Sequence, residues 1–382
     1  MKQFIKNNLT FFSLAAFIFL ISAIVYYRIF WRSDFGLHLS NINNYLENGM
    51  PKARFLYYWI TSIVALKDPA NLFKASLLVL ASCTALKYIV SVIYLKPKLS
   101  TFNISKPYAV IAFFLIFVFP IFIPQYLFFG RTYIGTFTPN IWHNSTTIAV
   151  FPFAILLYHL TIKQLNSFSW QKFYAIIFLV AINAYIKPSF LFVYVGALPL
   201  TVLIIKRTIS SSSLLQIAPI LLALILIFTA KSELYDTTVK HGIIFKPFLV
   251  YQATHAELSN LTLAFYILAS FILSLLFPIY VFIRKRVSFN DPEFVFTSVA
   301  MIGALFIYFS FAETGPRQLH GNFGWQRFIC SYLLFLVATK KAFKELTSTN
   351  IKTPNSYQII FSFHIIFGLI YIYRLLFLLN YR

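Results

Sequence analysis

The residues best suited to chemistry lie just beyond the first long apolar run of the sequence. Asp34 and His38 are four positions apart, so in a helix they share one face. A carboxylate at a membrane edge is costly unless paired or hydrated, and it can act as a general base or ligate a metal. Asp34 is therefore the candidate catalytic residue, with His38 as a candidate substrate-binding neighbour. The alternative is a helix cap beside an ordinary interfacial histidine.

A second polar stretch, residues 130–147, separates two apolar runs. A polar segment of this length at a membrane edge favours a hydrated cavity, because unsatisfied polar groups are expensive there. Its amide and imidazole groups can hydrogen-bond a polyhydroxyl ligand, its indole can stack on a sugar ring, and its guanidinium can stabilise a phosphate. The candidate substrate-binding residues within it are Arg131, Asn140, Trp142, His143 and Asn144. The alternative is a turn that caps the next span, with Trp142 in the aromatic belt.

Two further places add candidates for substrate binding. Lys187-Pro188 interrupts an apolar stretch long enough for two spans, and a lysine there can face an anion or simply snorkel to the surface. Residues 313–327 contain glycines that let backbone approach a ligand, and an arginine that can grip a phosphate. The candidates there are Glu313, Arg317, His320, Asn322 and Trp325. The alternative is an exposed turn with a Glu313–Arg317 ion pair.

Several other kinds of site lack support. The acidic and histidine residues of the long loop 231–260 match no zinc-binding spacing, so no metal ligands are assigned, although Asp34 can hold a divalent cation. The sequence contains no P-loop and no Gly-x-Ser-x-Gly elbow. Cys83 and Cys330 both lie in apolar runs and are expected to be packing residues.

The composition places these residues in a membrane protein. Of the 382 residues, 59% are hydrophobic and 20% aromatic, well above the apolar share of soluble domains. Only 11% are charged, so the net charge of +22 does not indicate a nucleic-acid-binding protein. The lipid bilayer is the expected surrounding, and nucleic acid is not an expected partner.

The hydrophobic runs predict an all-α, polytopic fold in one membrane domain, 1–382, with about eleven spans (range about 10–13). Residues 31–69 form an outer loop with interfacial helices, and residues 231–260 form a second long outer loop. Basic residues before the first span and in the alternate loops favour a cytoplasmic N-terminus. In this topology all the candidate site residues fall on the outer side. The predicted spans are 9–30, 70–95, 108–127, 143–163, 172–187, 188–205, 214–230, 261–283, 294–312, 324–339 and 357–379.

The chain resembles the GT-C superfamily of integral-membrane glycosyltransferases. Members carry a catalytic acidic residue in the first outer loop, where Asp34 stands, followed by an interfacial helix, a proline turn and a Leu-Tyr-Tyr segment, here 35–48, Pro51 and 56–59. Lys187-Pro188 also matches a pair common in the superfamily. The runs 139–144 and 321–325 resemble a group of bacterial envelope proteins of this type. The first loop has no second acidic residue beside Asp34.

The resemblance implies transfer of a sugar from a polyprenyl-phosphate or diphosphate glycolipid to a saccharide acceptor, at the outer face of the bacterial inner membrane. Asp34 is then the base, and Arg131, Lys187 or Arg317 stabilises the phosphate. The first alternative is an O-antigen or capsule repeat-unit polymerase. An alternative of another class is a transporter or flippase of lipid-linked saccharides, which should bury charges at mid-span, where Lys87 comes nearest. A non-catalytic assembly subunit is a third possibility.

Overall fold

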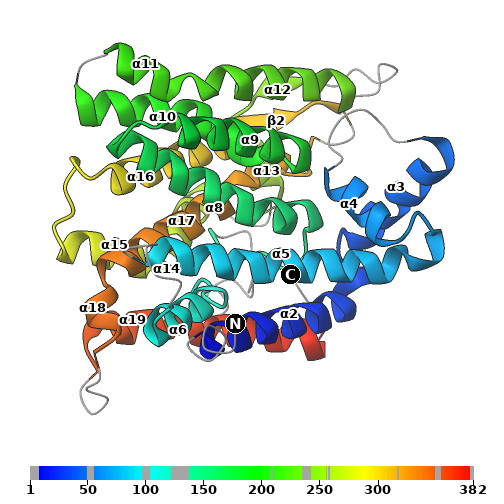
Figure 1. Ribbon diagram of the computed structural model, residues 1–382, viewed down its shortest axis with the longest axis horizontal. Helices are drawn as coiled ribbons and strands as arrows, with labels where there is room; N and C mark the ends of the chain where they lie inside the picture. Colours follow the sequence, from blue (N-terminus) through cyan, green and yellow to red (C-terminus); the bar gives the residue numbers. More distant parts are fainter. Residues whose placement is uncertain are drawn as a thin grey trace.

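The structure is a computed structural model, and the parts of the chain that it describes are almost entirely helical (Figure 1). The described residues are 8–49, 56–96, 104–121, 137–207, 210–234, 242–254, 256, 259–315, 318–348 and 354–378.

The first half of the chain contains long helices separated by short ones. Its elements are α2 (Leu9–Ile29), η1 (Phe30–Arg32), α3 (Phe35–Asn48), α4 (Leu56–Val64), η2 (Pro69–Asn71), α5 (Leu72–Leu95), α6 (Lys106–Leu115), α8 (Ser145–Asn166), α9 (Trp170–Ile186) and α10 (Ser189–Lys206). The two helices α3 and α4 occupy the first loop, 31–69, where the sequence predicts helices.

The second half adds a small strand pair to the helices. Its elements are α11 (Ser211–Ile217), α12 (Pro219–Leu234), β1 (Ile243–Phe245), α13 (Leu249–Thr254), α14 (Asn260–Ser274), α15 (Leu276–Arg284), α16 (Pro292–Ser310), β2 (Phe311–Glu313), η4 (Asn322–Gly324), α17 (Gln326–Lys341), α18 (Phe343–Leu346), α19 (Ser356–Tyr373) and the π-helical turn η5 (Arg374–Leu378). β1 and β2 pair antiparallel, with Ile244 opposite Ala312. The predicted long loop 231–260 therefore contains the end of α12, β1 and α13.

Six helices of the described chain are long and apolar enough to cross a membrane, or seven if the bent pair α14–α15 is one span. The prediction of about eleven spans is not confirmed. A helix rises about 1.5 Å per residue, so a hydrocarbon core about 30 Å thick needs roughly 20 residues. Several predicted spans are shorter helices, including α6, α9 and the 16-residue α17. The predicted span 261–283 is instead two helices that meet at 66°.

Local sequence signals explain where the helices begin and end. Asp291 caps α16, its Oδ1 accepting hydrogen bonds from the backbone N–H groups of Glu293 (3.0 Å) and Phe294 (3.2 Å). α9 and α10 are separate because Pro188 follows Lys187, which adopts the extended backbone favoured before proline. The candidate side chain of Lys187 therefore lies at a helix junction.

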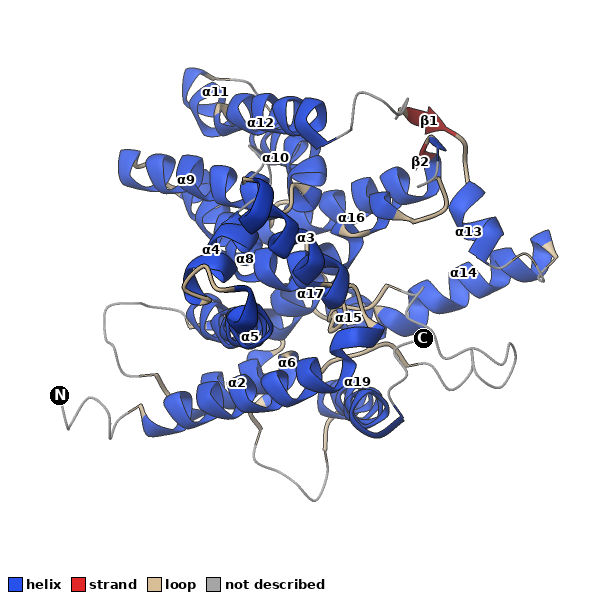
Figure 2. Cartoon of the chain, turned by 90° about the vertical axis from the view of Figure 1, so that its right-hand side faces the viewer, coloured by secondary structure: helices blue, strands red, loops and turns tan. Residues whose placement is uncertain are grey.

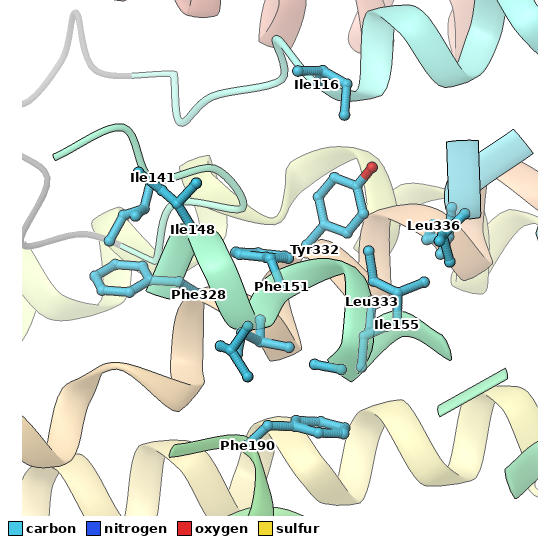
Figure 3. Close-up of a cluster of buried hydrophobic side chains, with 14 of the residues drawn as sticks. Ile116, Ile141, Ile148, Phe151, Ile155, Phe190, Phe328, Tyr332, Leu333 and Leu336 are labelled. Atoms are coloured by element: carbon cyan, nitrogen blue, oxygen red, sulfur yellow. The ribbon is translucent and has the colours of Figure 1, made fainter. Parts of the chain in front are cut away.

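The centre of the bundle is formed by α5, α8, α16 and α17. α5 packs against α2 and α8, and α16 packs against α10 and α17. Every residue of α17 from Gln326 to Thr339 is buried, so this helix is enclosed by the others. In the cluster drawn in Figure 3, Phe151 of α8 meets Tyr332 of α17 edge to face, with ring centroids 5.4 Å apart. Tyr332 also hydrogen-bonds Ser91 of α5 at 2.7 Å, which joins three helices.

The connections gather at two opposite ends of the bundle. In Figure 1, α11, α18 and the turn between α15 and α16 lie at the left end, and α3 and α4 lie at the right end. Figure 2 looks onto the end that carries α3 and α4. The left end contains the basic residues of these connections, among them Lys206, Arg207 and Lys285.

Large apolar side chains cover the outside of the long helices. Phe17 and Leu20 of α2 are 51% and 58% exposed, and Ile302 and Phe306 of α16 are 67% and 58% exposed. Such faces are compatible with lipid and would be unfavourable in water. The described chain is therefore that of a membrane protein.

Replacement of Phe151 by alanine tests the packing between α8 and α17. Phe151→Ala leaves a cavity beside Tyr332, so we expect a loss of about 3 kcal/mol in the free energy of unfolding. Phe178→Ala is the matched control, because Phe178 is 66% exposed on α9. Thermal unfolding in detergent measures both variants. Equal shifts in Tm for the two would contradict the assigned core.

Candidate functional site

The carboxylate of Asp34 joins two distant parts of the chain. Asp34 stands between η1 and α3, at the N-cap position of α3, but makes no side-chain cap bond to that helix. Its Oδ1 accepts a hydrogen bond from the backbone N–H of Ser145 at 3.1 Å, and its Oδ2 accepts one from Nδ2 of Asn144. The carboxylate therefore lies at the N-terminus of α8, where the helix dipole favours a negative charge.

His38 lies beside Asp34, as the four-residue spacing predicts. Its Nε2 is 3.5 Å from Oδ2 of Asp34, and its Nδ1 shares a hydrogen bond with the hydroxyl of Tyr58 on α4. The side chains of Asp34 and His38 remain 24% and 17% exposed, so a reacting group can reach them. Tyr58 was not a predicted site residue, because a tyrosine within an apolar run gives no sign of its partner.

Asn144 is the centre of this arrangement. Besides donating to Asp34, it caps α8 by accepting a hydrogen bond from the backbone N–H of Thr147 at 3.0 Å. The same Oδ1 accepts a hydrogen bond from Nζ of Lys187 at 2.7 Å, and Lys187 also donates to the hydroxyl of Thr147 at 2.8 Å. One buried amide thus connects a carboxylate to an ammonium group.

Trp325 completes the group on the side of α17. Nζ of Lys187 lies 4.2 Å from the centroid of the Trp325 ring, a cation–π contact, and the ring of His143 lies 6.3 Å from it. Trp325 is partly exposed. We refer to Asp34, His38, Tyr58, Asn144, Lys187 and Trp325 as the Asp34 cluster. It offers a carboxylate–imidazole pair, an ammonium group and an aromatic ring within one small region.

Asn140 and Trp142 are buried, and both line a small cavity beside Lys87. Asn140 accepts a hydrogen bond from Nζ of Lys87 at 2.6 Å, and its Nδ2 donates to the carbonyls of Leu115 and Val118. Trp142 is 3% exposed and packs beside Tyr26. This arrangement leaves no ring face for the sugar stacking expected of Trp142, and it makes Asn140 an anchor between helices.

The predicted residues near η4 form a separate group. Oε2 of Glu313, at the end of β2, accepts a hydrogen bond from Nδ2 of Asn322 at 2.7 Å. His320 is exposed. Arg131 and Arg317 lie outside the described residues, so their predicted roles, and the Glu313–Arg317 pair, stay predictions. This group is connected to the Asp34 cluster along the sequence, because Trp325 directly follows η4.

Within the described ranges, no three His, Cys, Asp or Glu side chains come together as a metal site would require. The prediction that Asp34 can hold a divalent cation therefore stays a prediction, with Asp34 as its single assigned ligand. Oxygen-rich groups of three or more ligands are usual for such cations.

A double-mutant cycle tests the connection through Asn144. We expect Asn144→Ala to lower the free energy of unfolding by about 1–2 kcal/mol, because α8 loses its cap and Asp34 loses a donor. Lys187→Met in the Asn144→Ala background should cost less than in the wild type, since the shared hydrogen bond is already gone. Asn44→Ala, which removes an exposed asparagine side chain from α3, is the control. Strict additivity of the two changes would argue against a direct link.

Comparison of the chain with protein-family models, with curated proteins and with solved structures finds no match. The function is therefore argued from the geometry of the Asp34 cluster and of the bundle around it.

Proposed function

We propose that this protein is a membrane glycosyltransferase that uses a polyprenyl-phosphate-linked sugar donor at the outer face of a bacterial inner membrane, in surface-polysaccharide assembly. The observation that carries the proposal is the pairing of Asp34 with His38 at the end of the first span. The side chain of Asn144 connects this pair to Lys187, because it donates a hydrogen bond to Asp34 and accepts one from Nζ of Lys187. These groups match the two needs of sugar transfer from a phosphate. The acceptor hydroxyl needs a base, and the departing phosphate needs a cation.

Asp34 is the proposed base. A carboxylate offers about four lone-pair positions, and the hydrogen bonds from Asn144 and Ser145 use two of them. The remaining positions can accept the proton of an acceptor hydroxyl as its oxygen bonds to the anomeric carbon of the donor sugar. The bond from that carbon to the phosphate oxygen breaks, and the phosphate leaves with the electron pair. His38, 3.5 Å away, then fixes the orientation of the carboxylate.

Lys187 and Trp325 are the proposed contacts for the donor. Nζ of Lys187 is held by Asn144 and Thr147 and faces the ring of Trp325. A lysine fixed in this way can offer its positive charge to a phosphate with little rearrangement. The partly exposed indole can stack against the sugar, the role expected from sequence for Trp142.

The distribution of basic residues supports an outward-facing site. Lys206, Arg207 and Lys285 lie in connections at the end of the bundle opposite α3 and α4 (Figure 1). Basic connections are favoured on the cytoplasmic side of a membrane. The Asp34 cluster would then face the periplasm, where a lipid-linked sugar is used for surface polysaccharide.

Asp34→Asn tests the proposed base directly. We expect sugar transfer in membranes of the native host to fall by at least 10²-fold, because asparagine cannot accept the proton. The surface polysaccharide should shorten or disappear while the amount of protein stays normal on a blot. Asp68→Asn is the matched control, because Asp68 caps η2 in the same loop. An unchanged glycan profile in Asp34→Asn would exclude the mechanism, and short chains in place of long ones would indicate a polymerase.

Lys87 supports a second candidate function, a transporter of lipid-linked saccharides. Lys87 is 6% exposed within α5, and its Nζ lies 3.5 Å from the centroid of the Phe151 ring and 3.8 Å from that of Tyr332. Buried charges and broken helices such as α14–α15 are typical of transporters.

Reconstituted vesicles separate the two functions. If the protein is a transporter, Lys87→Met abolishes movement of a fluorescent lipid-linked saccharide between leaflets and Asp34→Asn leaves it intact. If it is a glycosyltransferase, the wild type moves no lipid-linked saccharide, and transfer depends on Asp34.

A further inference from the structure

Arg327 is a buried cation that has no counterion among the residues that the structure describes. It is the second residue of α17 and is only 5% exposed. Its Nε and Nη1 are both buried and have no hydrogen-bond acceptor anywhere in the described chain. A buried guanidinium is strongly destabilising unless a hydrogen-bond acceptor or a negative charge compensates it. Proteins retain such groups where function requires them.

The surroundings of Arg327 are aromatic. Its Cζ lies 3.8 Å from the centroid of the Tyr308 ring and 4.7 Å from that of Phe328. Tyr308 in turn meets Tyr251 of α13 edge to face, with ring centroids 6.0 Å apart. These rings hold the guanidinium plane in place and supply no negative charge. The N–H groups of Nε and Nη1 therefore have no acceptor within the described chain.

The loop before α17 is shaped to hold this arrangement. A Cβ added at Gly324 would come within 2.8 Å of Cδ2 of Tyr308 and 3.4 Å of Cζ of Arg327. Only a glycine lets η4 pack this closely against the pair. Trp325, the next residue, contacts Lys187 of the Asp34 cluster and packs on Phe328. Arg327 is thus held in a fixed position, two residues after Trp325, which is one of the proposed donor contacts.

We propose that Arg327 is an anion-binding residue that grips the phosphate of the lipid-linked substrate. A planar guanidinium can donate two parallel hydrogen bonds to phosphate oxygens, and the N-terminus of the 16-residue α17 adds a favourable dipole. The anion site follows from the contacts of Arg327 alone, whereas the identity of the anion rests on the proposed function. Arg327 takes the phosphate-binding role that the sequence suggests for Arg131 and Arg317. The sequence does not set Arg327 apart from other arginines, and its burial without an acceptor for Nε and Nη1 is visible only in the fold.

Binding of three probes to the full chain in nanodiscs tests the proposal: farnesyl phosphate, farnesol and inorganic phosphate. We expect farnesyl phosphate to bind the wild type and to raise its Tm. Arg327→Met should weaken that binding at least tenfold and leave farnesol binding unchanged. Arg327→Lys, which keeps the charge but loses the planar fork, should fall between them. Lys344→Met, which removes an exposed cation on α18, is the charge-matched control and should bind like the wild type.

Stability without a probe separates binding from a structural role. Arg327→Met removes an unpaired buried charge, so its Tm should equal or exceed that of the wild type. The proposal would be overturned by two results together: Arg327→Met has a clearly lower Tm than the wild type, and Arg327→Lys binds farnesyl phosphate as tightly as the wild type does. Wild-type affinity for farnesyl phosphate in both variants would also overturn it.

The same measurements identify the source of the anion. Binding of farnesyl phosphate but not of inorganic phosphate supports a lipid-linked ligand, and equal Arg327-dependent binding of both supports a free anion at the same site. Asp34→Asn should keep wild-type affinity for farnesyl phosphate while it loses transfer. Arg327-dependent binding in a protein that transfers no sugar would refute the proposed function and leave the anion site standing.

Discussion

The amide of Asn144 connects three parts of the chain at the end of the bundle that carries α3 and α4. It donates to Asp34 from the first loop, caps α8 through the backbone N–H of Thr147, and accepts from Lys187 at the junction of α9 and α10. These three partners come from parts of the chain that are distant in sequence. The amide also separates a carboxylate from an ammonium group, so neither is neutralised by direct contact. The carboxylate keeps lone pairs beyond those that Asn144 and Ser145 use.

The position of Asn144 depends in turn on a second buried polar contact. The segment that leads into α8 is fixed at Asn140, which hydrogen-bonds Lys87 of α5, the carbonyl of the last residue of α6 and the carbonyl of Val118 just beyond it. Polar groups inside a bundle are stable only when their hydrogen bonds are made, and here each amide atom of Asn140 has a partner. Lys87 gains further stabilisation from the rings of Phe151 and Tyr332. The packed core of α5, α8 and α17 therefore determines where the Asp34 cluster lies.

Lys187 and Arg327 differ in how many partners their cationic groups have. Lys187 has two hydrogen-bond acceptors and an aromatic face, whereas the Nε and Nη1 of Arg327 have no acceptor in the described chain. A satisfied cation is already stable in the unliganded protein, and an unsatisfied one gains most when an anion arrives. Lys187 is thus suited to positioning and charge stabilisation, and Arg327 to binding. Trp325 lies between them in sequence and contacts Lys187 and Phe328.

The sequence by itself determined the membrane class, the helical pairing of Asp34 with His38 and the break at Pro188, because composition and local spacing decide these features. It did not determine the number of spans, since hydropathy records apolar runs and not whether a helix is straight or long enough, as α14–α15 and α17 show. Only the tertiary structure decided that Trp142 is buried while Trp325 faces Lys187, and that Arg327 lacks a partner. Contacts between α8, α10 and α17 decide burial and pairing, and nothing in local sequence encodes them.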